Sequence, residues 1–97
     1  MDECCNAGTK KVEKYEKLTS RALKEIKIKK GLTEKENAVA EDFLSMAKDY
    51  FSDAKHFKEK GELLTALAAF SYAHAWLDAG VRARLFDAKD DQLFTLP

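Results

Sequence analysis

Four side chains that could do chemistry lie at helical spacing in the C-terminal half of the chain: Ser71, His74, Asp78 and Arg82. On a helix, this spacing stacks a hydroxyl, an imidazole, a carboxylate and a guanidinium along one side. Such a polar stripe could bind a small ligand, or could use Asp78 to orient His74 for acid–base catalysis. We favour a structural interpretation, in which His74 hydrogen-bonds to a neighbour and Asp78 forms an i,i+4 ion pair with Arg82.

A second candidate site is a row of cations, here called the basic ridge: Lys10, Lys14, Lys17, Arg21 and Lys24. On a helix these residues share one exposed edge, where they could contact a run of phosphates or an acidic protein. Glutamates flank the ridge, and no aromatic side chain is interleaved for stacking on bases. Nucleic-acid or acidic-partner binding is therefore an alternative function, and an ordinary solvated helix face is the simpler interpretation.

The sequence offers no arrangement for a metal or a cofactor. Cys4 and Cys5 are the only cysteines, and no further ligands lie near them to complete a metal site. His56 and His74 are the only histidines and lack the spacing of metal ligands. The glycines are isolated, so no phosphate-binding loop is expected. We expect no metal, no cofactor and, on balance, no enzyme.

Three helices with one apolar stripe each are predicted to position these side chains. They are expected over about residues 10–30, 34–60 and 62–86. Thr9 would cap the first and Gly31 would end it. The second begins with the capping box Thr33-Glu34-Lys35-Glu36. Gly61 leaves room only for a sharp reversal before the third helix.

The third helix is apolar on more than one side, which predicts that it lies between the other two. Its alanines would let a neighbouring backbone approach closely. The expected fold is all-α: an antiparallel three-helix bundle with a long hairpin of the second and third helices. Residues 9–97 would form this single domain, preceded by a flexible tail over 1–8 and closed by a tail over 87–97.

Five apolar or aromatic residues are candidates for an interface: Tyr72, Trp76, Leu93, Phe94 and Leu96. The two aromatic residues would either pack under the first helix or stay partly exposed as anchors for a dimer or a partner. The apolar end of the chain would either pack back onto the domain or dock on another protein. Self-association is therefore a fair expectation.

The composition agrees with a small globular protein. The chain is 45% hydrophobic and 35% charged, with 17 cations balanced by 17 anions. Neutrality argues against a globally basic nucleic-acid-binding surface. Two adjacent cysteines supply no disulfide framework, which favours a reducing cytoplasm. No apolar run approaches the roughly 20 residues that span a bilayer, so no membrane partner is expected.

The run ALAAFSYAHAWLDAGVR, residues 66–82, resembles the signature of a short archaeal family, the domain of unknown function 357 family. The similarity extends from the first helix to the closing Leu93-Phe94-Thr95. This resemblance implies a three-helix fold and an archaeal, cytosolic source, and it implies no activity. The favoured function is therefore a non-enzymatic module that binds another protein or itself. The basic ridge is the alternative, and a ligand or enzyme site at the polar stripe is a weaker one.

Overall fold

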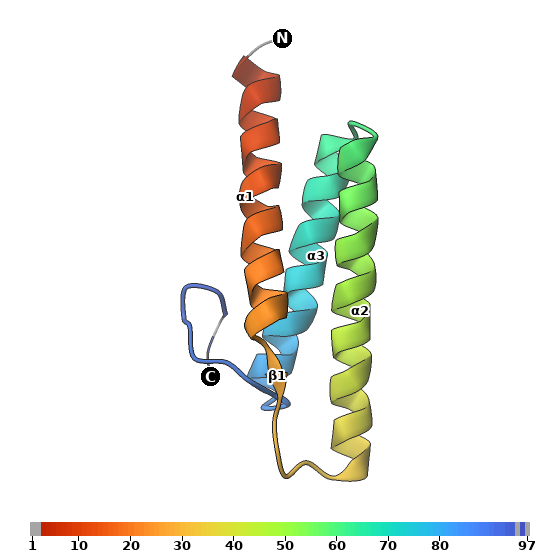
Figure 1. The fold of residues 1–97 in the computed structure, drawn as a ribbon, viewed down its shortest axis with the longest axis vertical. Helices are drawn as coiled ribbons and strands as arrows, with labels where there is room; N and C mark the ends of the chain where they lie inside the picture. Colours follow the sequence, from red (N-terminus) through yellow and green to blue (C-terminus); the bar gives the residue numbers. More distant parts are fainter. Residues whose placement is uncertain (1–2, 95, 97) are drawn as a thin grey trace.

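The computed structural model describes residues 3–94 and 96, with side chains for 8–94 and 96. Three long helices follow one another: α1 (Glu3–Glu25), α2 (Glu34–Glu59) and α3 (Leu63–Arg82). Successive helices run in opposite directions, so α1 and α3 point the same way (Figure 1). α3 lies between the other two and packs against both, whereas α1 and α2 contact each other little. The predicted all-α fold, an antiparallel three-helix bundle with a long α2–α3 hairpin, is confirmed.

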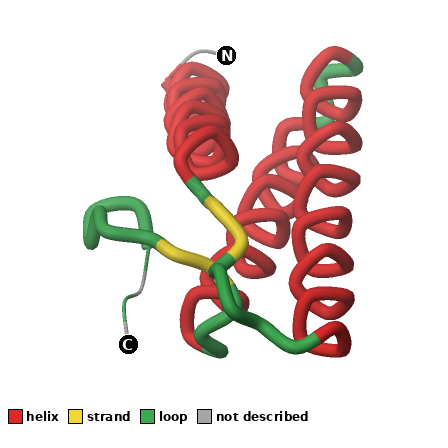
Figure 2. The backbone as a smooth tube through the Cα atoms, turned by 60° about the horizontal axis from the view of Figure 1, so that its bottom comes forward, coloured by secondary structure: helices red, strands yellow, loops and turns green. Residues whose placement is uncertain are grey.

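A short antiparallel strand pair, absent from the prediction, ties the ends of α1 and α3 together. β1 (Lys27–Ile28) pairs with β2 (Phe86–Asp87), with Lys27 opposite Asp87 and Ile28 opposite Phe86. Figure 2 shows the two strands meeting where the chain leaves α1. The alternation of lysine and isoleucine over residues 26–29 suits a strand with one buried side. This pairing ends both helices earlier than the sequence analysis predicted.

The bounds of α1 differ from the predicted 10–30 at both ends. The helix begins at Glu3, so residues 3–8 are helical rather than a tail, because no proline interrupts them and the apolar stripe behind them holds the helix in place. It ends at Glu25, and Gly31 lies in the following loop with a φ of 82°. Gly31 therefore shapes the approach to α2 instead of ending α1.

Both ends of α2 follow the prediction closely. The Thr33 hydroxyl accepts from the Glu36 N–H and the Glu36 carboxylate accepts from the Thr33 N–H, which confirms the capping box. At the other end Gly61 has a φ of 81°. Its N–H donates to Lys58 and the Glu62 N–H donates to Phe57, as in a Schellman motif. The reversal at Gly61 is therefore confirmed.

The end of α3 repeats this motif with a different residue. The N–H of Arg84 donates to Val81 and that of Leu85 to Gly80, while Arg84 itself has a φ of 62°. α3 therefore ends at Arg82 rather than at 86. The turn brings the Phe86 ring onto Gly80, where an added Cβ would lie 2.2 Å from the ring. Gly80 is thus a packing position that only glycine fits.

The core runs along both flanks of α3 in two clusters. Val12, Ala54, Ala66 and Phe70 form one near the hairpin turn. The larger one, near the strand pair, includes Ala22, Ala47 and Leu77. α2 contributes only alanines to the fully buried set, so α2 and α3 approach closely. An ion pair of 2.6 Å between Lys58 and Glu16 joins α2 to α1 and raises the pKa of Lys58.

Candidate functional site

The solvent-exposed side of α3 carries no charge over most of its length. We call this surface the outer face and define it by six exposed residues: Leu64, Thr65, Ala68, Tyr72, Ala75 and Ala79. The first Asp, Glu, Lys or Arg of α3 is Asp78. In a chain that is 35% charged, an exposed helix face is expected to carry charged residues. Leu64 is instead 82% exposed and Tyr72 50%, so two large side chains meet solvent here.

An aromatic edge borders the outer face on the side of α2. The ring centroids of Tyr72 and Tyr50 are 4.4 Å apart, and Trp76 meets Phe43 edge-on at 5.1 Å. Burial raises the pKa of Tyr50, and the neighbouring Tyr72 raises it further. The aromatic partners of Tyr72 and Trp76 thus come from α2, not from the N-terminal helix considered in the sequence analysis.

A shallow apolar hollow of about 230 Å³ lies on the outer face, lined by Tyr72, Ala75, Trp76 and Ala79. At this edge the indole Nε1 of Trp76 is buried and has no hydrogen-bond partner among the described residues. An unsatisfied buried donor costs roughly 1–3 kcal/mol. The hollow itself is therefore apolar, and it lies beside a buried donor that has no partner among the described residues.

His74 of the polar stripe is engaged on both ring nitrogens. Nε2 lies 2.5 Å from the carbonyl oxygen of Leu93 and Nδ1 lies 3.3 Å from the hydroxyl of Thr19. Because a carbonyl can only accept, Nε2 donates to Leu93. The Thr19 hydroxyl also donates to the carbonyl oxygen of Phe70 at 3.5 Å. The structural interpretation of His74 therefore has two identified partners, and Asp78 is neither of them.

The rest of the polar stripe divides between a hollow and the end of the chain. Ser71, His74 and Asp78 line a hollow of about 270 Å³ between α1 and α3, together with Tyr15 and other residues. The guanidinium of Arg82 instead donates to the carbonyl of Leu96 at 2.8 Å. The structure thus brings three of the four stripe residues together and turns the fourth toward the C-terminal segment.

The C-terminal segment packs onto this side of the domain. The Asp90 carboxylate accepts from the Gln92 N–H at 2.9 Å, and the Asp90 carbonyl accepts from Leu93 and Phe94 at 3.1 Å. This turn places Leu93 and Phe94 in the core, 3% and 4% exposed. Leu96 is half-buried against the same cluster. Of the candidate interface residues, Leu93 and Phe94 are therefore core residues in this structure, while Tyr72 and Trp76 stay at the surface.

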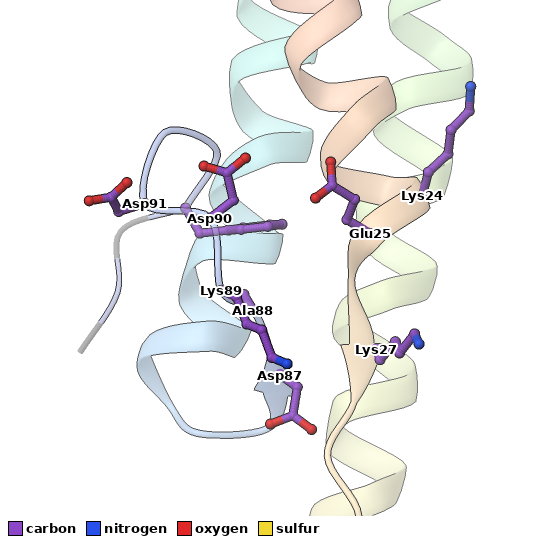
Figure 3. A pocket seen from close by; sticks show the side chains of 9 residues that line it. Lys24, Glu25, Lys27, Asp87, Ala88, Lys89, Asp90 and Asp91 are labelled. Atoms are coloured by element: carbon purple, nitrogen blue, oxygen red, sulfur yellow. The ribbon is translucent and has the colours of Figure 1, made fainter.

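The basic ridge is exposed along its whole length, but it is not uniformly positive. The guanidinium of Arg21 lies 3.8 Å from the carboxylate of Glu25 and 3.7 Å from that of Asp90 in the C-terminal segment, so these two carboxylates partly neutralise its charge. Figure 3 shows the open pocket beside the tail, with the side chains of Glu25 and Asp90 on the same level and Lys24 and Lys27 directed away from the tail. Lys10, Lys14 and Lys17 line a groove with Glu13 and Leu18.

Among the described side chains, those of residues 8–94 and 96, no three His, Cys, Asp or Glu residues gather as metal ligands. The side chains of the adjacent Cys4 and Cys5 lie outside the residues whose side chains the structure describes. None of the helices in the described part of the chain has the length and hydropathy needed to cross a membrane.

Two residues that matter for this arrangement were missed in the sequence analysis. Thr19 is fully buried and partners His74, and Gly80 accommodates the ring of Phe86. Thr19 lies seven residues after Val12 and seven before Ile26, in the middle of the apolar stripe. A polar residue at that position is a signal for a buried hydrogen bond, and it could have been used.

The comparisons with known proteins identify a family whose function is not known. The family model described as "Protein of unknown function (DUF357)" matches residues 14–86, which is most of the chain. The chain therefore belongs to this family, as the run over residues 66–82 indicated. The match ends at Phe86, so it includes all of α3 and does not extend to Leu93-Phe94-Thr95. No curated protein and no solved structure matches the chain.

Proposed function

We propose that this protein is a non-enzymatic helical interaction module that self-associates through the outer face of α3. The observation that carries the proposal is the long uncharged, exposed surface of α3 in a chain that is 35% charged. Covering such a surface removes apolar groups from water without desolvating a charge. Its cysteine content suits a reducing, cytoplasmic setting.

The shape of the outer face supports contact with another helix. Ala68, Ala75 and Ala79 are small, so a second backbone can approach to the short end of the usual 8–10 Å between helix axes. Tyr72 and Trp76 stand beside them as large aromatic groups of the kind that anchor interfaces.

The proposal is tested by measuring the molar mass in solution over a range of concentrations by light scattering. We expect a monomer–dimer equilibrium for the native chain and a monomer for Ala75→Glu, because the glutamate would be desolvated in the interface. Ala38→Glu is the matched control on an exposed position of α2. A native chain that stays monomeric at millimolar concentration would contradict the proposal.

Trp76 gives a second, independent reading of the same equilibrium. It is the only tryptophan, and it lines the hollow on the outer face. Covering the hollow should shift its fluorescence emission to shorter wavelength as the concentration rises. If the molar mass doubles while the emission stays constant, association occurs elsewhere on the molecule.

The basic ridge supports a second candidate, binding of nucleic acid or an acidic protein. Its specific support is the groove lined by Lys10, Lys14 and Lys17, all three of which are exposed on α1. Binding to a short RNA should weaken steeply with salt and should be lost in Lys14→Glu/Lys17→Glu. Lys48→Glu, on α2, is the matched control, and absence of binding at low salt would end this candidate.

A further inference from the structure

We infer that the partner on the outer face is a second copy of this chain, related by a twofold axis parallel to α3, so that α1 of each copy lies against α2 of the other. This inference rests on the proposed function and adds the geometry of the contact. It follows from the charges on the two sides of the outer face.

An acidic row borders the outer face on the side of α2. Asp42, Asp49 and Asp53 are exposed and follow one another at helical spacings of seven and four residues. The row lies beside the aromatic edge, since Asp53 adds to the effects of burial and of Tyr72 in raising the pKa of Tyr50. The ring of Tyr50 in turn contacts the ring of Tyr72 on the outer face, with the centroids 4.4 Å apart.

The basic ridge borders the outer face on the other side. Leu18 lines the groove of the ridge together with Lys14 and Arg21. The same Leu18 lines the hollow between α1 and α3 that reaches Ala75 of the outer face. The outer face is thus an uncharged strip between the basic ridge on α1 and the acidic row on α2, and these two helices lie on opposite sides of α3 (Figure 1). Asp78 lines the hollow on the α1 side of the strip.

The two charged edges also match along the length of the molecule. Val12 packs with Ala54 and Ala66, which sets Lys14 level with Asp53 near the hairpin turn. Ala22, Ala47 and Leu77 belong to one buried cluster, which sets the end of α1 level with the lower part of the acidic row. Arg21 there already lies within 3.8 Å of Glu25 and 3.7 Å of Asp90. The correspondence of opposite charges along α3 is therefore carried by Lys14 and Asp53, near the hairpin turn.

Symmetry decides what these edges meet in a dimer. A twofold axis parallel to α3 keeps each residue at its position along the helix axis and exchanges the α1 side with the α2 side. Each basic ridge therefore lies against the acidic row of the other copy. A twofold axis across α3 would make the two helices antiparallel and would set ridge against ridge and row against row. Like charges in an interface are unfavourable, and opposite charges steer and orient the encounter. Charge complementarity therefore selects the parallel arrangement.

The available surface is large enough for such a contact. The molecule measures 52 × 23 × 16 Å, and α3 alone is about 30 Å long at 1.5 Å per residue. A standard interface buries roughly 800 Å² on each partner. The uncharged strip with its two charged edges supplies an apolar centre and a polar rim, which is the usual composition of a specific interface.

Cysteine cross-linking distinguishes the two orientations. The native Cys4 and Cys5, the only cysteines, are replaced by serine, and Ala68→Cys and Ala79→Cys are made separately in that background. In the parallel dimer every outer-face residue lies near its own copy, so both variants form disulfide-linked dimers on mild oxidation. In the antiparallel dimer, positions about 16 Å apart along the helix cannot both lie at the axis, and a mixture of the two variants forms the mixed disulfide instead.

Charge reversal gives an independent test, because the two arrangements predict opposite changes in the dissociation constant of the dimer. In the parallel dimer, Lys17→Glu and Asp49→Lys should each raise the dissociation constant about threefold to tenfold, from exposed pairs formed twice by symmetry. The combined variant Lys17→Glu/Asp49→Lys should restore the native value. In the antiparallel dimer each single reversal would relieve repulsion and tighten the dimer.

The outcomes separate this inference from the proposed function. A dimer in which Ala68→Cys and Ala79→Cys cross-link only with each other, or which Asp49→Lys tightens, overturns the parallel geometry and leaves self-association standing. A native chain that remains monomeric overturns both. Cross-linking of each variant with itself, with weakening by both single reversals, is the result expected here.

Discussion

The two sides of α3 have nearly the same chemistry and opposite environments. On the inner side Ala66, Ala73 and Phe70 are fully buried between α1 and α2. On the outer side Ala68, Ala75 and Tyr72 are exposed. Both sides are small, apolar or aromatic, and neither carries a charge before Asp78. Residue types alone therefore do not separate the side that stabilises the fold from the side that is free to bind.

The difference lies in what the rest of the chain places against each side. The inner side is covered by two helices and, near its end, by the C-terminal segment and the strand pair. No other described element covers the outer side between Leu64 and Ala79. Substitutions on the inner side should thus change the free energy of unfolding, and substitutions on the outer side should change association. The following predictions test that separation, in order of decreasing effect on stability.

The largest effect is expected from Phe94→Ala on the covered side. Phe94 is 4% exposed and its ring centroid lies 6.2 Å from that of His74. Loss of a buried phenylalanine ring costs about 3–5 kcal/mol, so the urea midpoint should fall strongly. Leu64→Ala, at an 82% exposed position of the outer face, is the control and should leave the midpoint nearly unchanged. Equal effects of the two substitutions would contradict the assignment of Phe94 to the core.

Gly80→Ala tests the close contact at the covered end of α3. The new methyl would overlap the ring of Phe86, which is itself only 4% exposed and so has little room to move. Overpacking of this kind costs about 1–3 kcal/mol, more than the helix propensity gained by replacing glycine. In Gly8→Ala, the control in α1, the methyl would meet only Leu63 at 3.9 Å. That variant should be neutral or up to about 1 kcal/mol more stable.

Arg84→Gly should stabilise the protein. Arg84 holds a left-handed conformation, with φ 62°, at the position that Gly61 occupies after α2 with φ 81°. Such a conformation costs a residue with a side chain about 1 kcal/mol more than glycine, so the variant should gain about that amount in chemical denaturation. Gly61→Ala is the converse change and should lose a similar amount. A loss of stability in Arg84→Gly would mean that the exposed side chain makes a favourable contact.

Much of this architecture could be predicted from the sequence because its signals are local. The capping box at Thr33 and the glycine at 61 act within a few residues of themselves, and both were identified. The end of α1 was misplaced because it depends on strand pairing between Lys27 and Asp87, which are 60 residues apart in the sequence. Local propensity carries no information about such a partner.

The candidate site was harder to predict for a related reason. The spacing of Ser71, His74 and Asp78 correctly placed them on one side of a helix, where they line one hollow. The partners of His74 are Thr19 and Leu93, from two other parts of the chain. Which side of an alanine-rich helix stays exposed depends likewise on how α1 and α2 pack against it. Hydrophobic periodicity alone predicts that both sides of α3 are buried.

The smallest effect on stability is expected from Ala68→Lys on the outer face. Ala68 is exposed, and lysine has almost the helix propensity of alanine, so unfolding of the dilute protein should change by less than about 0.5 kcal/mol. Association should nevertheless weaken, because two symmetry-related lysines would lose water in the interface. Sedimentation equilibrium and urea titration on the same samples measure both quantities. Ala68→Ser is the uncharged control and should preserve association. If Ala68→Lys unfolds the protein instead, the outer side of α3 is part of the core and the contrast between its two sides fails.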